Sequence, residues 1–307
     1  KAGQTPQSST TISIPKTPEV LAKMHRVYDL TYNKKAKLSP SALNCYLDCP
    51  LKFYLKYVAN LQKPDEVNAE IDSATFGSIF HKTAEYIYQD LTACNKLIIK
   101  EDIEKLLKDD IRLEDYVDKA FKELFFHLPQ EEKPEYNGTQ LINSAVIVRY
   151  IKQLLKHDLN YAPFTFVGTE MQVNEEISVQ TSEGTFQSRI GGYIDRLDSK
   201  DGTLRIVDYK TGGKADTPAD VESLFIPDKK RSGHVFQTFL YASIVSKMQN
   251  LKVAPSLLYI HKAASEDYSP VICLKEGKSG TEPVTDFSMY EDEFREGLQK
   301  LLDEIFH

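Results

Sequence analysis

Apolar residues recur every three or four positions in the first half of the chain, the spacing of an amphipathic helix. Leu43 and Leu47 follow this spacing directly after Ser39 and Ser41, residue types that favour the start of a helix. The same pattern predicts three further helices, over residues 76–91, 103–128 and 142–155. The first half of the chain is therefore expected to be mostly helical.

From residue 164 the period of the apolar residues changes to two, which predicts β-strands. The expected strands are 164–173, 185–197 and 204–210, and the turn signals Glu183-Gly184 and Asp201-Gly202 separate them. The rest of the chain predicts a helix at 235–248, strands at 256–261 and 270–274, and an amphipathic helix at 289–306. Helices around a central mixed sheet indicate the α/β class.

The composition is that of a soluble globular protein. Of its 307 residues 41% are hydrophobic, too many for a disordered chain, and no apolar run is long enough to span a membrane. The net charge of −7 argues against coating nucleic acid by bulk charge, although it does not exclude a local basic groove. Four cysteines are too few for a disulfide scaffold, and the start has no secretory pattern, so we expect a cytoplasmic protein.

The first 37 residues differ in composition from the rest of the chain. They begin without Met and combine a Ser/Thr run at 8–11 with three prolines, which is typical of a linker. We expect 1–37 to be a linker or disordered extension of a longer polypeptide. Residues 38–307 are expected to form a single domain, with a helical part at 38–160 and the sheet with its helices at 161–307.

The chemically informative residues lie where the last two strands of the predicted meander meet at a turn. Side chains alternate along a strand, so Asp208 and Lys210 point to the same side of the sheet. If a four-residue turn pairs Asp198 with Thr203, Asp195 becomes the diagonal neighbour of Asp208 on that same face. A register one residue off would instead separate the two carboxylates onto opposite faces.

Two carboxylates on one face suit a hard divalent cation such as Mg²⁺ or Mn²⁺. Such a cation lowers the pKa of a bound water and neutralises the charge that develops during displacement at a phosphate. Lys210 would add positive charge at the attacking water or the phosphoryl oxygens. An Asp-x-Lys strand is also common on solvated sheet faces, so the pair alone does not establish catalysis.

Several motifs, taken in chain order, resemble the RecB-like branch of the PD-(D/E)xK nucleases, and most closely the C-terminal nuclease domain of RecB and AddB helicase-nucleases. The motifs that carry this resemblance are Leu38-Ser39-Pro40-Ser41-Ala42-Leu43, Cys49-Pro50-Leu51-Lys52-Phe53-Tyr54, Phe76-Gly77-Ser78-Ile79-Phe80-His81, Gly192-Tyr193-Ile194-Asp195-Arg196-Leu197-Asp198, Val207-Asp208-Tyr209-Lys210-Thr211-Gly212 and Gln237-Thr238-Phe239-Leu240-Tyr241. The resemblance implies an α/β fold with a restriction-endonuclease-like central mixed sheet, flanking helices and an added N-terminal helical region. It makes 38–307 a nuclease domain.

The resemblance also implies a set of site residues. In that family the positions of Asp195 and Asp208 bind the metal, the position of Lys210 is the catalytic lysine, and the backbone carbonyl at the position of Tyr209 faces the metal. A helical histidine matching His81 is a further ligand. His81 lies off the apolar stripe of its predicted helix, although a lone helical histidine is more often satisfied or solvated than bound to a metal.

Glu85 and Glu170 are secondary candidates, and Gln237 and Tyr241 are substrate-binding candidates, each with two interpretations. Glu85 either orients His81 from one turn away or is an ordinary surface glutamate. Glu170 either fits an acidic position found in some relatives or is an exposed strand carboxylate. Gln237 and Tyr241, four residues apart on a predicted helix, either position the DNA backbone or the catalytic groups together, or form the edge of an amphipathic helix.

A basic stretch follows the predicted catalytic strand. Lys214 and the run 228–234, which contains Arg231, could bind DNA phosphates without reading the sequence, or form a solvated loop. These two residues are therefore added to the substrate-binding candidates.

Two motifs found in relatives are incomplete here. Cys49 matches one ligand of an iron–sulfur cluster, but the only cysteine after Cys94 is Cys273, so we expect no such cluster. The nearest match to a phosphate-binding loop, Gly277-Lys278-Ser279, has Ile272 at the position of the required first glycine. Any helicase motor is therefore expected outside this chain.

These inferences predict a Mg²⁺- or Mn²⁺-dependent deoxyribonuclease, with exonuclease action favoured. Its expected partners are DNA and a helicase domain or subunit of a recombination and repair enzyme. We expect no association with a membrane. The alternative is a catalytically silent nuclease-like domain that binds DNA or a helicase partner. A free-standing nuclease, or one acting on RNA, is not excluded by the sequence.

Overall fold

The computed structural model describes residues 13–61, 70–181, 184–228, 230–248, 251–265, 267–277 and 279–307. In this part of the chain, five strands form one sheet in the order β1-β2-β3-β4-β5. The strands are β1 (Leu97–Ile98), β2 (Phe164–Thr181), β3 (Gly184–Lys200), β4 (Thr203–Lys210) and β5 (Lys252–Tyr259). Because β5 joins β4 in parallel and the other pairs are antiparallel, the sheet is mixed, and the expected α/β class is confirmed.

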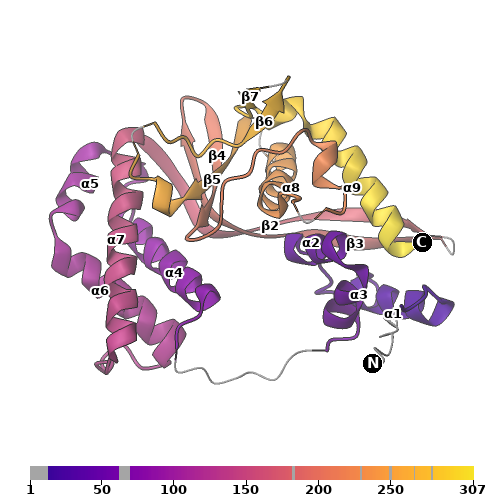
Figure 1. Cartoon of the computed structure of the whole chain (residues 1–307), viewed down its shortest axis with the longest axis horizontal. Coiled ribbons are helices and arrows are strands. Elements are labelled where there is room, and N and C mark those ends of the chain that lie inside the picture. Colours follow the sequence, from indigo (N-terminus) through magenta and orange to yellow (C-terminus); the bar gives the residue numbers. More distant parts are fainter. Residues whose placement is uncertain are drawn as a thin grey trace, which may run out of the picture.

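Helices form two groups along the long β2–β3 ribbon, as Figure 1 shows. One group contains α4 (Ser73–Leu91), α5 (Lys100–Leu107), α6 (Asp110–Phe121), the π-helical turn η2 (Lys122–Phe126) and α7 (Gly138–Tyr161). The other contains α1 (Pro18–Tyr28), α2 (Pro40–Asp48), α3 (Pro50–Phe53), the π-helical turn η1 (Tyr54–Val58), α8 (Gly233–Met248) and α9 (Glu291–Phe306). The short elements are η3 (Glu222–Leu224), η4 (Ile260–Lys262), β6 (Cys273–Glu276), β7 (Gly280–Pro283) and η5 (Phe287–Met289).

Strand β4 contributes to two hydrophobic cores because its side chains alternate. Leu204 and Ile206 belong to the core formed with α1, α2, α8 and α9. Val207 and Tyr209 belong to the core formed with α4 to α7. This strand therefore runs between the two helical groups, and its C-terminal end is where both groups meet the sheet.

The turn between β3 and β4 contains two residues, not the four assumed from the sequence. Asp201 and Gly202 have φ angles of 50° and 76°, which matches a type I′ turn that favours the natural strand twist. Lys200 therefore pairs with Thr203, and the expected pairing of Asp198 with Thr203 is wrong by two residues. A shift of two preserves the face of every side chain, so the predicted convergence of the carboxylates survives.

Several predicted elements have different bounds in the structure. The single helix expected over 103–128 is divided after Leu107, because Asp109 caps a new helix by accepting a hydrogen bond from the Arg112 backbone N–H. The strand expected at 270–274 is divided, because residue 271 makes an isolated bridge to Ser256 and residues 273–274 begin β6. Within the described residues, no helix combines the length and the apolarity needed to cross a lipid bilayer.

The expected linker over 1–37 is wrong for residues 18–28, which form α1. Thr17 caps this helix and Pro18 occupies its first turn, an arrangement that favours helix formation. Met24 and Tyr28 are buried against the core, so the apolar face of the helix is held by tertiary contact. Residues 1–12 lie outside the described residues.

Gly191 occupies a position that other residues cannot share. Its φ is 148°, and a Cβ atom there would lie 2.0 Å from the Val173 carbonyl oxygen. We expect Gly191→Ala to lower the free energy of unfolding by about 1–3 kcal/mol, because the strained backbone and the clash act together. Gly138→Ala is the control, since nothing lies within 4 Å of its Cβ position. Urea unfolding that gave the same midpoint for both variants would contradict this.

Candidate active site

Three acidic residues occupy equivalent positions on three neighbouring strands. The neighbouring pairs of β2 and β3, Thr169 with Arg196 and Met171 with Ile194, place Glu170 opposite Asp195. The pairing of β3 with β4, continued by one residue, places Asp208 opposite Asp195 as well. Glu170 has a φ of 48°, a conformation that costs energy in a non-glycine residue and is often found at functional sites. The sheet therefore lines up a row of carboxylates across its centre.

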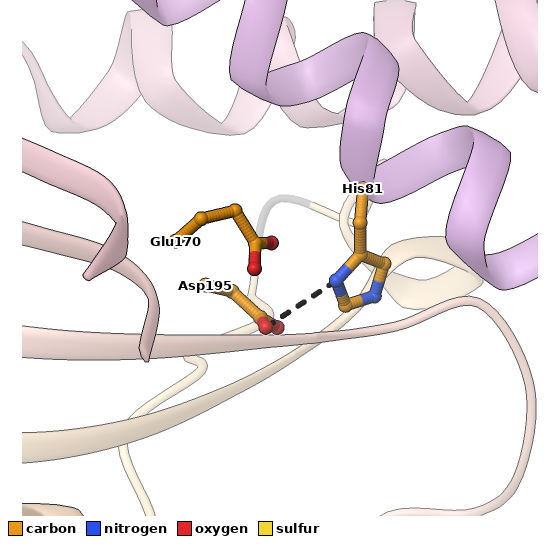
Figure 2. A group of neighbouring side chains, drawn as sticks. All are labelled: His81, Glu170 and Asp195. Atoms are coloured by element: carbon orange, nitrogen blue, oxygen red, sulfur yellow. Dashed lines mark ion pairs between the residues drawn. The ribbon is translucent and has the colours of Figure 1, made fainter. Parts of the chain in front are cut away.

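Helix α4 adds a histidine to this row. The Nδ1 atom of His81 lies 3.3 Å from Oδ1 of Asp195. One candidate ligand atom from each of His81, Glu170 and Asp195 lies within 4.8 Å of the others. Figure 2 shows these three side chains converging on one point from the helix and the two strands. Of the two interpretations of Glu170, the geometry favours the site residue.

The end of β4 fixes the remaining groups. The backbone N–H of Tyr209 donates to Oδ2 of Asp195 at 2.7 Å. Lys210 Nζ lies 2.5 Å from Oδ2 of Asp208, and Gln237 from α8 donates its amide to Oδ1 of Asp208 at 3.0 Å. Asp208 is thus held between the strand lysine and α8, beside the group of three rather than within it.

The two aspartates differ in the environment of their charge. Burial alone would raise the pKa of Asp195, but His81, Lys210 and the Tyr209 N–H outweigh it and hold that pKa below its ordinary value. Burial raises the pKa of Asp208 in spite of Lys210, and the neighbouring Asp195 adds to the rise. Burial also disfavours the charged forms of His81 and Lys210, yet the carboxylates raise both their pKa values. The site therefore concentrates negative charge that a cation would relieve.

The residues present fit a divalent metal ion. Carboxylate oxygens and one imidazole nitrogen are a common ligand set for such ions. In addition, Oδ2 of Asp208 is buried, and its described positive neighbour is the Lys210 ammonium at 2.5 Å. The backbone carbonyl of Tyr209 stays a predicted metal ligand, because the Tyr209 contact that the structure gives at this site is made by its backbone N–H.

These groups open into a cavity of about 860 Å³ between α4, the sheet and the start of α8. Its lining includes the site residues His81, Glu170, Asp195 and Lys210, together with the loop 211–213 that follows β4. The Lys210 side chain is 17% exposed and lines the cavity, so its ammonium group is accessible from there.

The candidates on α8 take up different positions. Gln237 faces the site, as its contact with Asp208 shows. Tyr241 is buried one turn later, and its hydroxyl oxygen lies 2.6 Å from where a Cβ atom of Gly192 would be. Burial raises the pKa of Tyr241, so its hydroxyl stays neutral. The glycine of the Gly-Tyr-Ile-Asp motif therefore makes room for the helix that carries Gln237.

Arg231 does not serve the expected role of a phosphate contact. Its side chain is only 2% exposed, and its guanidinium binds Asp48 at 2.6 Å and Asn44 Oδ1 at 2.6 Å. These contacts join the start of α8 to α2. Lys214 is exposed beside the loop that lines the cavity, and stays a candidate.

Glu85 lines the cavity but is not seen to orient His81. Its carboxylate lies 3.2 Å from Lys82 Nζ and accepts a hydrogen bond from Gln89. His81 pairs with Asp195 instead.

The sequence analysis did not identify His234 as a site residue, although it lines the cavity one helical turn before Gln237. The i, i+3 spacing of these two residues was the available signal.

Comparison with known proteins agrees with this geometry. Residues 37–307 match the family described as the PD-(D/E)XK nuclease superfamily. The chain is 26% identical over 252 residues to an ATP-dependent helicase/deoxyribonuclease subunit of Clostridium acetobutylicum, covering 74% of this chain and 20% of the relative. It is 28% identical over 182 residues to the corresponding helicase/deoxyribonuclease subunit from Streptococcus pyogenes, covering 57% of this chain and 14% of the relative.

The match to the family extends over most of the chain, and it confirms the resemblance expected from the motifs. The chain spans only a fifth or less of the length of these curated relatives. Their names therefore describe much longer proteins. On the strength of the family match and of the carboxylate row with its strand lysine, this chain belongs to the PD-(D/E)XK nuclease superfamily.

Proposed function

We propose that this chain is a Mg²⁺- or Mn²⁺-dependent deoxyribonuclease that removes nucleotides from DNA ends and acts in the cytoplasm with a helicase domain or subunit. The observation that carries the proposal is the row of Glu170, Asp195 and Asp208, of which Glu170 and Asp195 line one cavity together with His81 and Lys210. The helicase partner and the DNA substrate rest on the names of the relatives, which are helicase/deoxyribonuclease subunits.

Each residue of the row has a task in this proposal. His81, Glu170 and Asp195 would hold the metal, with Asp208 next to them. A divalent cation, when bound, polarises the phosphodiester and makes water a better nucleophile at neutral pH. Lys210 stabilises negative charge on the phosphoryl oxygens or orients the attacking water. Gln237 holds Asp208 in place through its hydrogen bond. Because Asp208 forms an ion pair with Lys210, Gln237 also helps to fix the position of Lys210.

The metal dependence is tested by titrating Mn²⁺ or Mg²⁺ into the protein with labelled single- and double-stranded DNA. We expect products that appear with the metal and disappear with a chelator, because the carboxylates repel phosphate until a cation neutralises them. Closed circular single-stranded DNA is the control for exonuclease action, since it has no ends and should stay intact.

The alternative function, a silent domain that binds DNA or a helicase partner, predicts stable binding without products in the same titration. The filled positions of Asp195, Asp208 and Lys210 argue against it. Cleavage of RNA in preference to DNA would redirect the substrate assignment while leaving the catalytic residues in place.

A further inference from the structure

We propose that a second cavity, between α2, η1 and the start of α8, binds the nucleotides next to the scissile phosphate, and that its occupant is a single strand. This inference rests on the proposed nuclease function and adds a binding surface to it. Lys52, Lys56 and Tyr57 line this cavity from α3 and η1, and none of them was among the site candidates.

The second cavity adjoins the first. It measures about 810 Å³ and is lined by residues of α2, α3 and η1 together with Asp216 and residues between 227 and 237. His234 lines both cavities. Gln237, whose amide holds Asp208, lines the second as well. A polymer bound at the carboxylate row therefore passes His234 to enter the second cavity.

Two lysines of this cavity carry positive charges without an ion-pair partner among the described residues. Lys52 and Lys56 lie four residues apart, both are exposed, and neither forms an ion pair within 4.0 Å with any described residue. Among the acidic lining residues, Asp48 is neutralised by Arg231, and Asp228 accepts the backbone N–H of Lys230.

The other acidic groups of this cavity, Asp216 and Asp228, belong to the segment before α8. Lys52 and Lys56, in α3 and η1, thus form a separate pair of positive charges within the lining. Their spacing on consecutive turns suits contacts with successive phosphates of one backbone.

An aromatic ring accompanies the lysines. Tyr57 lines the cavity, and the Nζ atom of Lys56 lies 5.1 Å from the centre of its ring. Phe53 supports the ring from the core side, with the two ring centres 5.8 Å apart. Lysines beside an aromatic ring are the usual means of holding a single strand, because its bases are free to stack on the ring. The bases of a duplex are paired and stacked on one another, so they are not free to stack on a protein ring.

The test compares Lys52→Gln/Lys56→Gln with the wild type on two oligothymidylates, of about 4 and about 16 nucleotides, in Mn²⁺. We expect kcat/KM on the long oligonucleotide to fall at least tenfold, with kcat at saturation unchanged and the short oligonucleotide cleaved as before. The slope of log kcat/KM against log salt should also become shallower by about 1.4, because two phosphate contacts are lost from a single strand.

A matched control separates this effect from a general loss of positive charge. Lys100→Gln/Lys108→Gln removes two exposed lysines at the two ends of α5 that line neither cavity. This variant should keep the wild-type salt slope and the wild-type kcat/KM on both oligonucleotides. Tyr57→Ala should lower kcat/KM on the long oligonucleotide in the same way. Tyr57→Phe should keep the wild-type value, since phenylalanine retains the aromatic face on which a base stacks.

The outcomes distinguish the two proposals. If the wild type cuts and the Lys52/Lys56 variant behaves like the α5 control, the second cavity is not a strand-binding site, whereas the nuclease function stands. An equal loss on short oligonucleotides, or on duplex DNA, would also overturn the inference. If the wild type does not cut in any metal, the nuclease proposal itself fails.

Discussion

Replacing Lys210 with Ala is expected to abolish DNA cleavage, with a loss of at least about 100-fold in kcat, while the protein stays folded. The ammonium group reaches the cavity and is the ion-pair partner of the buried Asp208. Its removal takes away the charge proposed to stabilise the phosphoryl oxygens. It also leaves Asp208 without its cation, which raises the pKa of that carboxyl further. The measurement is the rate of product release from labelled DNA in saturating Mn²⁺.

Asp208→Ala is expected to give a loss of similar size by removing the other half of the pair. Lys247→Ala serves as the control, because this lysine pairs with Glu175 on the surface, outside the cavity. Circular dichroism on each variant checks that the fold persists. Undiminished cutting by either purified active-site variant would refute the assignment of these residues.

A second large effect is expected from the charges buried beneath the β3–β4 hairpin. Asp158 on α7 and Arg196 on β3 are both fully buried and joined by two hydrogen bonds of 2.5 and 3.0 Å. Arg205 binds Asp198 in the same bidentate way, at 3.0 and 2.8 Å. Asp158→Ala would leave Arg196 short of a partner in the interior. We expect it to lower the free energy of unfolding by about 3–5 kcal/mol.

The same ion pair predicts how stability changes with pH. Burial alone would raise the pKa of Asp158, but Arg196 and Arg205 outweigh it and hold that pKa below its usual value. The stabilisation is therefore fully present above the pKa of an unfolded aspartate, about 3.9, and is lost as the pH falls through the folded value. Urea unfolding between neutral and acidic pH should show a smaller loss of stability for Asp158→Ala than for the wild type.

The control for the buried pair is the exposed pair of Glu296 and Lys300 on α9, whose side chains are 70% and 74% exposed. Glu296→Ala should leave the urea midpoint unchanged, because solvent screens a surface ion pair. If Asp158→Ala were as stable as Glu296→Ala, the buried network would not be what joins α7 to the hairpin. Loss of this network is also expected to slow cleavage, since Arg196 directly follows Asp195 on β3.

The local sequence was sufficient where the determining contacts are short-range. Alternation along β4 alone puts Asp208 and Lys210 on one face, and the Asp201-Gly202 turn needs only the two residues that adopt positive φ. The register was wrong by two residues because the turn was counted as four, and the site survived this error because strands have a period of two. Helix α1 was missed because its stability comes from burying Met24 and Tyr28.

The sequence by itself determined the α/β class, the family and the strand pair that carries Asp195, Asp208 and Lys210, since periodicity and motif order are properties of neighbouring residues. The tertiary structure decided which distant groups join them. It brought Glu170 and His81 to Asp195, assigned Arg231 to packing against α2, and made His234 the junction of two cavities. These outcomes depend on how helices from two separate cores pack against one sheet, and such long-range contacts leave no periodic signal in the chain.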